Sequence, residues 1–254
     1  MPTAPADDPP RSLPRLHVVI PVRSASDGKA RLGPAIDAEE RAAIVVGLLR
    51  RTLEVIAQVP AICAVTVVSG DSTLLALARR LGAAAVRDHT PTAAPATTAA
   101  ADNLNAALRQ GRTAALADGA ASLLFLPADL PLLSVAALER LIDAADAALA
   151  AGGGRPIVVI APSDARGGTN ALLLVPPAVI DPCFGPASLA AHLRGAADSA
   201  ASVQLVADPE LGFDLDTPDD LERLDPPRLV ELQDLGATTL DERASEALAA
   251  ADVH

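Results

Sequence analysis

The chain has 254 residues, of which 50% are hydrophobic, so it can bury a sizeable core and fits one large α/β domain. Aromatic residues make up only 1% of it and its formal net charge is −12. This composition excludes most nucleic-acid-binding proteins, because few rings are available to stack on bases and a polyanion would be repelled. Cys63 and Cys183 lack CxxC spacing and nearby histidines, so we expect no zinc site or disulfide framework, which fits the reducing cytoplasm.

In chain order, strands and helices alternate, which predicts an α/β protein with a mostly parallel sheet flanked by helices. The apolar runs and their periods predict these elements: strand Leu16–Val22, helix Asp37–Gln58, strand Ala64–Ser69, helix Ser72–Leu81, strand Ala84–Arg87, a long loop Thr90–Ala101, helix Asn103–Asp118, strand Ser122–Pro127, a helix capped by Ser134 and ended by Gly152, and strands Ile157–Ala161, Ala171–Val175 and Val203–Val206.

The two ends of the chain differ from this central pattern. Residues 1–15 are rich in Pro, Asp and Ala and lack the basic and apolar regions of a signal peptide, so they are predicted to be a disordered tail. Residues 225–254 are predicted to be a C-terminal appendage with one weak helix and a candidate capping box of Thr239 and Glu242. The domain itself then spans 16–224. No apolar run reaches about 18 residues, so no membrane span is expected.

Ligands of an open parallel sheet bind beyond the carboxyl ends of its strands, so the polar loops there hold the first candidates for a site. The loop after the first strand contains Lys29 and Arg31, and Gly28 allows close backbone approach. Two cations in this loop could hold a triphosphate and neutralise charge that develops during phosphoryl transfer. The alternative is a solvated basic loop.

Two acidic segments could hold a hard cation. Asp129 follows the most apolar strand and lies between two prolines, where a carboxylate suits Mg²⁺, although a simple turn residue is the alternative. Asp214 and Asp216 share one face of a short extended stretch, just before a helix that Thr217 caps. We favour Asp216 as the second metal carboxylate, the alternative being a purely structural acid.

Two further segments could bind an anion. A glycine pair precedes Thr169 and Asn170, which suits a backbone cradle for a phosphate or carboxylate, or else a hairpin turn. Downstream, Gly185 and Ser188 stand at the start of a helix. This helix also carries His192 and Arg194, two basic groups that could contribute to the anion site, although a lone histidine is more often an ordinary surface residue.

Together these segments resemble one enzyme family. The IPV strand with Lys29 and Arg31, then LPADLPLL, GGTNALL, FGPAS and DLDTPDDL, resemble the guanylyltransferases of coenzyme F420 biosynthesis in order and spacing over Leu16–Leu224. The resemblance implies a single-domain, Rossmann-like nucleotidyltransferase fold of the GT-A type with a mostly parallel mixed sheet. It also implies transfer of GMP from GTP to 2-phospho-L-lactate, phosphoenolpyruvate or 3-phosphoglycerate, with loss of pyrophosphate.

The resemblance also assigns roles to particular residues. Asp129 and Asp216 would hold Mg²⁺, Lys29 and Arg31 match the family's KxRL loop and would bind the triphosphate, and Thr169, Gly185 and Ser188 would bind the phosphorylated acid. Two departures bear on nucleotide binding. Arg23 stands where the family commonly has Lys, and it is expected to bind the nucleotide. The family also commonly has a Gly before a Leu-Asn pair, where this chain has Asn103 before Leu104 and Asn105. Asn105 is expected to bind the nucleotide.

Other functions stay open at this point. Nucleotidyltransferases of molybdopterin or sugar phosphates usually carry a Gly-rich LxGGxGxR loop after the first strand, where this chain has Pro21–Ser26. A non-catalytic nucleotide-binding scaffold would be supported by loss of either carboxylate, but both Asp129 and Asp216 are present. The sequence leaves the acceptor open, and it leaves the oligomeric state open between a monomer and a homodimer.

Overall fold

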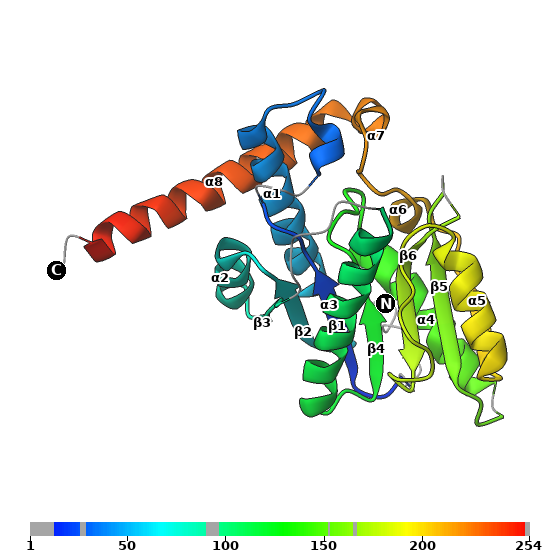
Figure 1. Cartoon of the computed structure of the whole chain (residues 1–254). Coiled ribbons are helices and arrows are strands. Elements are labelled where there is room, and N and C mark those ends of the chain that lie inside the picture. The colour runs from blue at the N-terminus through cyan, green and yellow to red at the C-terminus, as the bar shows by residue number, and fades with distance from the viewer. Residues whose placement is uncertain (1–12, 26–28, 90–96, 152, 165–166, 252–254) are drawn as a thin grey trace, which may run out of the picture.

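The computed structural model describes residues 13–25, 29–89, 97–151, 153–164 and 167–251. These residues form a seven-stranded sheet in the order β3-β2-β1-β4-β6-β5-β7 (Figure 1). Only β6 runs antiparallel to its neighbours, so the predicted mostly parallel mixed sheet is confirmed. The strands are β1 Leu16–Pro21, β2 Ile62–Ser69, β3 Ala84–Arg87, β4 Ser122–Phe125, β5 Ile157–Pro162, β6 Thr169–Val175 and β7 Ser202–Leu205.

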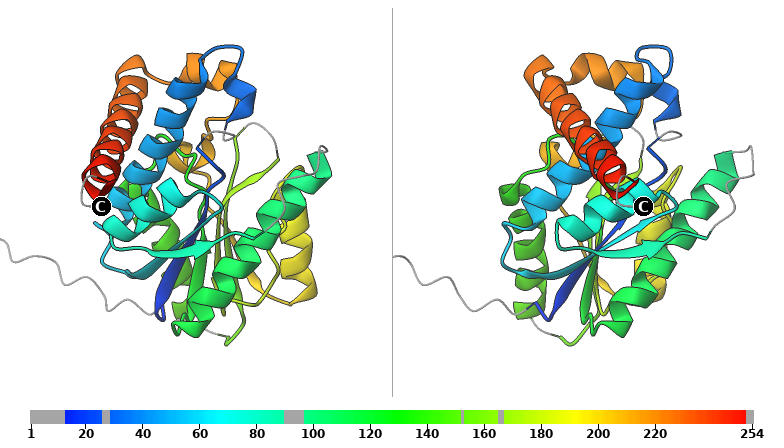
Figure 2. Two further views of the ribbon diagram at one scale, coloured as in Figure 1. Left: turned by 60° about the vertical axis from the view of Figure 1, so that its left-hand side comes forward. Right: turned by 90° about the vertical axis from the view of Figure 1, so that its left-hand side faces the viewer.

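Helices cover both faces of the sheet (Figure 2). The helices α1 (Ala38–Ile56), α2 (Ser72–Arg80) and α4 (Val135–Ala150) pack on one face. The helices α3 (Thr97–Ala117) and α5 (Ser188–Asp198) pack on the other. Strand residues alternate between these two cores, which is why the strands read as unbroken apolar runs in the sequence.

Helix starts follow local capping chemistry. Asp37 and Glu40 form a complete capping box at α1, and the hydroxyl of Ser134 accepts from the N–H of Ala137 at α4. Thr217 caps α7 (Pro218–Arg223) as predicted, and it forms a capping box with Asp220. A one-turn helix, α6 (Pro209–Gly212), follows its cap residue Asp208 and was not predicted.

One prediction about a segment end was wrong. Helix α3 begins at Thr97, inside the predicted loop Thr90–Ala101, because alanine has a high helix propensity even where no apolar period is visible. Residues 90–96 of that loop lie outside the described residues. Of the predicted tail, 1–12 also lie outside, whereas the N–H of Leu13 donates to Asp146 Oδ1 at 2.6 Å and the carbonyl of Arg15 accepts from Ala121.

The C-terminal segment forms one long helix, α8 (Pro226–Ala251), that packs along α1 (Figure 1). The predicted capping box at Thr239 is wrong, because this residue is buried inside the helix and its hydroxyl donates to the carbonyl of Leu235 at 2.8 Å. The two helices approach closely at glycines. A Cβ on Gly236 would lie 1.8 Å from the carbonyl oxygen of Ala43, so a larger residue there would separate the helices.

The strand order also locates the site. Strand β1 lies between β2 and β4, so the chain changes direction across the sheet beside β1, and the crevice beyond the carboxyl ends of β1 and β4 is the expected ligand position. Among the described residues, no helix has the length and apolar character that a membrane crossing requires.

The α1–α8 contact gives a stability prediction. Gly236→Ala should lower the free energy of unfolding by about 1–3 kcal/mol, because overpacking outweighs the roughly 1 kcal/mol by which alanine favours a helix. Gly195→Ala in α5 is the matched control, because its new methyl would meet its nearest neighbour, Ile180 Cγ2, only at 3.4 Å. Urea unfolding of both variants measures the difference. A Gly236 variant as stable as the control would contradict the close packing.

Candidate active site

Three charged side chains from distant parts of the chain meet at the carboxyl end of the sheet. Lys29 follows β1, Asp129 follows β4, and Asp216 precedes α7. The Nζ atom of Lys29 lies 2.9 Å from Asp129 Oδ2 and 2.6 Å from Asp216 Oδ1. The structure therefore brings together both predicted metal carboxylates and the predicted triphosphate lysine in one cluster.

Backbone hydrogen bonds fix the two carboxylates relative to each other. The N–H of Leu215 donates to the carbonyl of Asp129 at 3.0 Å, which joins the two acidic segments. Asp220 Oδ2 accepts from the backbone N–H groups of Asp216 at 3.0 Å and Thr217 at 2.8 Å. The cap of α7 thus holds the backbone that carries Asp216.

Arg51 of α1 supports the loop that follows β4, a role that no sequence pattern predicts. Its guanidinium donates to the carbonyls of Leu133 at 2.8 Å and Pro131 at 3.3 Å. The same group lies 3.6 Å from Glu231 of α8. A lone arginine on a predicted helix shows no pattern that would reveal this contact, so only the structure identifies it.

The charges of the cluster depend on one another. Burial alone lowers the pKa of Lys29, but the neighbouring Asp129 and Asp216 carboxylates outweigh this effect, so the pKa of Lys29 is raised. Burial raises the pKa of Asp129, and the nearby Asp216 adds to this rise although Lys29 opposes it. Lys29 therefore stays an ammonium, and its charge favours the ionised form of the Asp129 carboxyl.

The two carboxylates fit a magnesium ion. Both contact one cationic atom in this structure, the Lys29 ammonium, so they already surround a single cation position. Within the described part of the chain, no group of three or more His, Cys, Asp or Glu side chains could hold a metal. Mg²⁺ commonly takes one or two protein carboxylates and completes its shell with phosphate oxygens and water, so Asp129 and Asp216 suffice.

The basic residues around Lys29 differ in their surroundings. The Lys29 side chain is only 11% exposed, so the alternative of a solvated lysine is wrong. Arg23 and Arg31 of the same loop are exposed, and their contact with the nucleotide stays a prediction. Asp71, the cap of α2, anchors this loop by accepting from the N–H of Ala25 at 2.9 Å. Gly28 lies outside the described residues.

Asp214 and Asp216 were predicted to share one face of an extended stretch, but their side chains have different partners. Asp214 Oδ1 accepts from the hydroxyl of Ser163 at 2.9 Å and from the amide of Asn170 at 3.4 Å. Asp216 instead contacts Lys29. These partners support the choice of Asp216 as the second metal carboxylate.

The predicted acceptor residues gather where β6 meets α5. Thr169 begins β6 and Ser188 begins α5, and both are buried. The N–H of Leu189 donates to the carbonyl of Gly167 at 3.2 Å, so the glycine-rich turn touches the helix start. The N–H of Ser188 donates to the carbonyl of Gly185 at 3.1 Å. The three predicted groups thus lie around one turn and one helix terminus.

Asn105 of α3 holds the loop before α5. Its amide donates to the carbonyl of Phe184 at 2.9 Å and its oxygen accepts from the N–H of Phe184 at 2.8 Å. Next in the chain, Gly185 has a φ of +126°, and a Cβ on it would lie 2.9 Å from Ala101 Cβ, so glycine is required there. Asn105 therefore supports the predicted acceptor loop, and its contact with the nucleotide stays a prediction.

His192 differs from its predicted role as a basic group near an anion. Its side chain is 1% exposed, so the surface alternative is wrong as well. Burial lowers the pKa of His192 to about 4, and the ring is therefore neutral near pH 7. Arg194 is exposed on α5.

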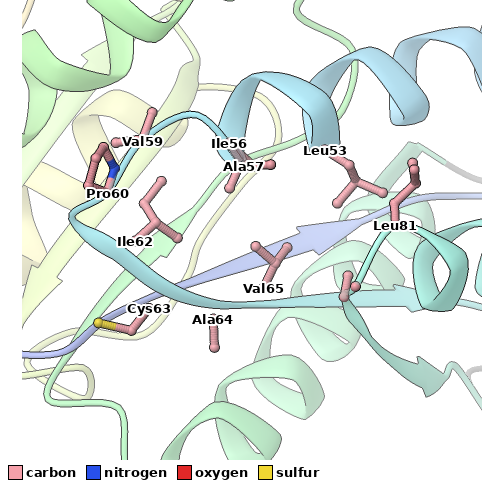
Figure 3. Close-up of a pocket in the computed structure, with 12 residues that line it drawn as sticks. Leu53, Ile56, Ala57, Val59, Pro60, Ile62, Cys63, Ala64, Val65 and Leu81 are labelled. Carbon is pink, nitrogen blue, oxygen red and sulfur yellow. The ribbon is translucent and has the colours of Figure 1, made fainter.

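A separate cavity of about 250 Å³ lies at the opposite end of the sheet, between the end of α1 and the start of β2 (Figure 3). The side chains that line it are mostly apolar and include Leu53, Ile56, Val59 and Ile62, with Cys63 at one side. None of the predicted site residues lines it, so this cavity has no part in the charged cluster.

The fold and the charged cluster define a nucleotidyltransferase-like protein. A solved structure of a Desulfovibrio desulfuricans protein assigned as a nucleotide-diphospho-sugar transferase matches with a TM-score of 0.62, covering 89% of this chain and 97% of that one at 15% identity. A 4-diphosphocytidyl-2C-methyl-D-erythritol synthase from Anaerococcus prevotii matches with a TM-score of 0.53, covering 86% and 96% at 10% identity. These identities show the fold alone, and the predicted fold class is confirmed.

The family follows from sequence similarity. The model of the family described as guanylyl transferase CofC like matches residues 16–224, and the chain belongs to this family. It is 41% identical to the phosphoenolpyruvate guanylyltransferase of Rubrobacter xylanophilus over 83% of this chain and 93% of that one. It is 36% identical to the enzyme of the same name from Rhodococcus erythropolis over 90% and 100%. The predicted family is confirmed, and the chain is a guanylyltransferase.

The cluster gives a prediction about the metal. Lys29→Met should lower the free energy of unfolding without Mg²⁺ by about 1–3 kcal/mol, because two adjacent carboxylates lose their cation. Both carboxylates are about 30% exposed, so the loss should be smaller than for a fully buried pair. Added Mg²⁺ should raise the melting temperature of Lys29→Met more than that of the wild type.

Arg31→Met serves as the control, because it removes an exposed cation from the same loop and should leave the response to Mg²⁺ unchanged. Melting curves with and without Mg²⁺ measure all three proteins. Equal Mg²⁺ responses of Lys29→Met and the wild type would show that the lysine does not share the cation position.

Proposed function

We propose that this protein transfers GMP from GTP to phosphoenolpyruvate or 2-phospho-L-lactate with release of pyrophosphate, in the cytoplasm, as a step of coenzyme F420 biosynthesis. One observation carries the proposal: Asp129 and Asp216 converge on a single cation position beyond β1 and β4. Phosphoenolpyruvate is favoured, because the similar enzymes of Rubrobacter xylanophilus and Rhodococcus erythropolis are named for that acceptor.

The reaction is an in-line displacement. An oxygen of the acceptor phosphate attacks the α-phosphorus of GTP, and the bond from the α-phosphorus to the bridging oxygen of the β-phosphate breaks, so pyrophosphate leaves. Mg²⁺ held by Asp129 and Asp216 would neutralise phosphate charge in this site. No covalent enzyme intermediate is needed, because positioning and charge neutralisation supply most of the rate enhancement in phosphoryl transfer.

The basic loop after β1 would hold the triphosphate. Lys29 is buried beside the cation position, where an ammonium can neutralise the charge that grows on the departing pyrophosphate. Arg31 and Arg23 are exposed in the same loop, and the planar guanidinium group of arginine suits contact with nucleotide phosphates. Their location beside Lys29 supports this assignment.

The turn before β6 and the start of α5 would hold the acceptor. Thr169 and Ser188 supply hydroxyl groups. Gly185 has no side chain, so the backbone there can approach the acceptor closely. Neutral donors at the start of α5 suit a phosphate or carboxylate, since the N-terminus of a helix favours negative charge. Both classes of group are present on a phosphorylated carboxylic acid.

The proposal is tested by pyrophosphate release with GTP and a panel of phosphorylated acids. We expect the highest kcat/KM with phosphoenolpyruvate, measurable turnover with 2-phospho-L-lactate, and none with a sugar 1-phosphate, which lacks the carboxylate. ATP in place of GTP serves as the nucleotide control. Binding of GTP without pyrophosphate release from any acid would refute the proposed reaction.

A second prediction concerns the two carboxylates. Asp129→Asn and Asp216→Asn should each reduce kcat/KM by at least about 100-fold while the protein stays folded, because the amide keeps the shape and loses the charge. Asp219→Asn, which changes an exposed carboxylate in the first turn of α7, is the control and should retain activity. Near-normal turnover of either first variant at saturating Mg²⁺ would remove that residue from the metal site.

A further inference from the structure

We propose that His192 is a positioning residue that fixes the hydroxyl of Thr169 as a hydrogen-bond donor toward the acceptor. The inference rests on the proposed function, in which Thr169 binds the phosphorylated acid. It goes beyond that assignment, because it says which residue sets the direction of the threonine proton and how.

The two ring nitrogens of His192 have different partners. Nε2 lies 2.9 Å from the backbone nitrogen of Cys183, and Nδ1 lies 2.9 Å from Oγ1 of Thr169. A backbone N–H can only donate, so Nε2 must be the acceptor and carries no proton. The contact with Cys183 therefore determines the protonation of Nε2.

The position of the remaining proton follows from the charge of the ring. His192 is neutral near pH 7 because burial lowers its pKa to about 4. A neutral imidazole carries one N–H, which must then be on Nδ1, so His192 donates to Thr169 Oγ1. The hydroxyl has one proton and now accepts from the ring, so its own proton must point along another direction.

The location of Thr169 indicates toward which group its hydroxyl can donate. Thr169 begins β6 directly after the glycine pair, on the side where Ser188 begins α5. A Cβ built on Gly168 would lie 3.8 Å from Ser188 Oγ, so the turn and the helix start are adjacent. A hydroxyl oriented in this way can donate its proton to a substrate that offers only phosphate and carboxylate oxygens.

The ring itself is held in place. The Phe184 ring packs edge-on against His192, with centroids 5.1 Å apart and an interplanar angle of 69°. Phe184 packs in turn against Phe125 of β4, with centroids 6.4 Å apart. His192 therefore links two segments of the acceptor site: the start of β6, and the Cys183–Phe184 backbone that leads to Gly185.

Two substitutions of His192 test the roles of its two ring nitrogens separately. In His192→Gln, the side-chain oxygen can still accept from Cys183, but the donor to Thr169 is lost. In His192→Asn, the amide nitrogen lies near the position of Nδ1 and can still donate to Thr169. Thr169→Val removes the hydroxyl and keeps the shape. His89→Gln, at an exposed histidine, is the matched control.

We expect His192→Gln and Thr169→Val each to raise the KM for phosphoenolpyruvate about tenfold, the order expected for one hydrogen bond to a charged group, while the KM for GTP changes less than about twofold. The double variant should be no worse than either single one, because both remove the same interaction. His192→Asn should stay within about threefold of the wild type.

Three outcomes would overturn the inference. The effects of His192→Gln and Thr169→Val could multiply in the double variant, the KM for GTP could rise as much as that for the acid, or ¹⁵N NMR of the histidine rings could show the proton of His192 on Nε2. The NMR measurement needs no turnover and applies to the folded wild type. If the wild type releases pyrophosphate but one of these outcomes holds, the inference fails alone; if no acid reacts, the proposed function fails with it.

Discussion

The contact of one lysine with two aspartates is the constraint on which the rest of the site depends. Asp129 and Asp216 lie close enough to touch the same ammonium, and like charges at such a distance would repel without a cation between them. The sheet order, the loop after β4 and the cap of α7 all serve to hold this pair together. A cation of some kind is therefore required at this position, whether from Lys29 or from a bound metal.

The C-terminal helix is connected to this constraint through packing. Leu232 of α8 joins a buried cluster with Leu48 of α1 and with Leu215, the neighbour of Asp216. On the polar side, Glu231 lies beside Arg51, which holds the carbonyls of the loop after Asp129. Helix α8 begins after residue 224, where the family match ends, yet it supports both acidic segments.

The strands and the position of Asp129 could be predicted from local sequence patterns, whereas contacts between residues far apart in the chain could not. The apolar runs identified the strands, and their carboxyl ends pointed to Asp129 because the ends of parallel strands meet at one edge of a sheet. The sequence could not show that Arg51 would reach the loop after β4, or that His192 would be buried against Phe184. Each of those contacts joins residues whose proximity exists only once the helices have packed.

The start of strand β6 connects the charged cluster with the turn before α5. Thr169 and Asn170 are consecutive in β6, where the pairing with β5 is irregular, and their side chains have different partners. Thr169 contacts His192 of α5, whereas the amide of Asn170 donates to the carbonyls of Leu211 and Gly212, both at 3.0 Å. Those carbonyls precede the segment that carries Asp216. One strand therefore connects the Thr169–His192 contact with the segment that leads to Asp216, and a displacement of β6 would move both.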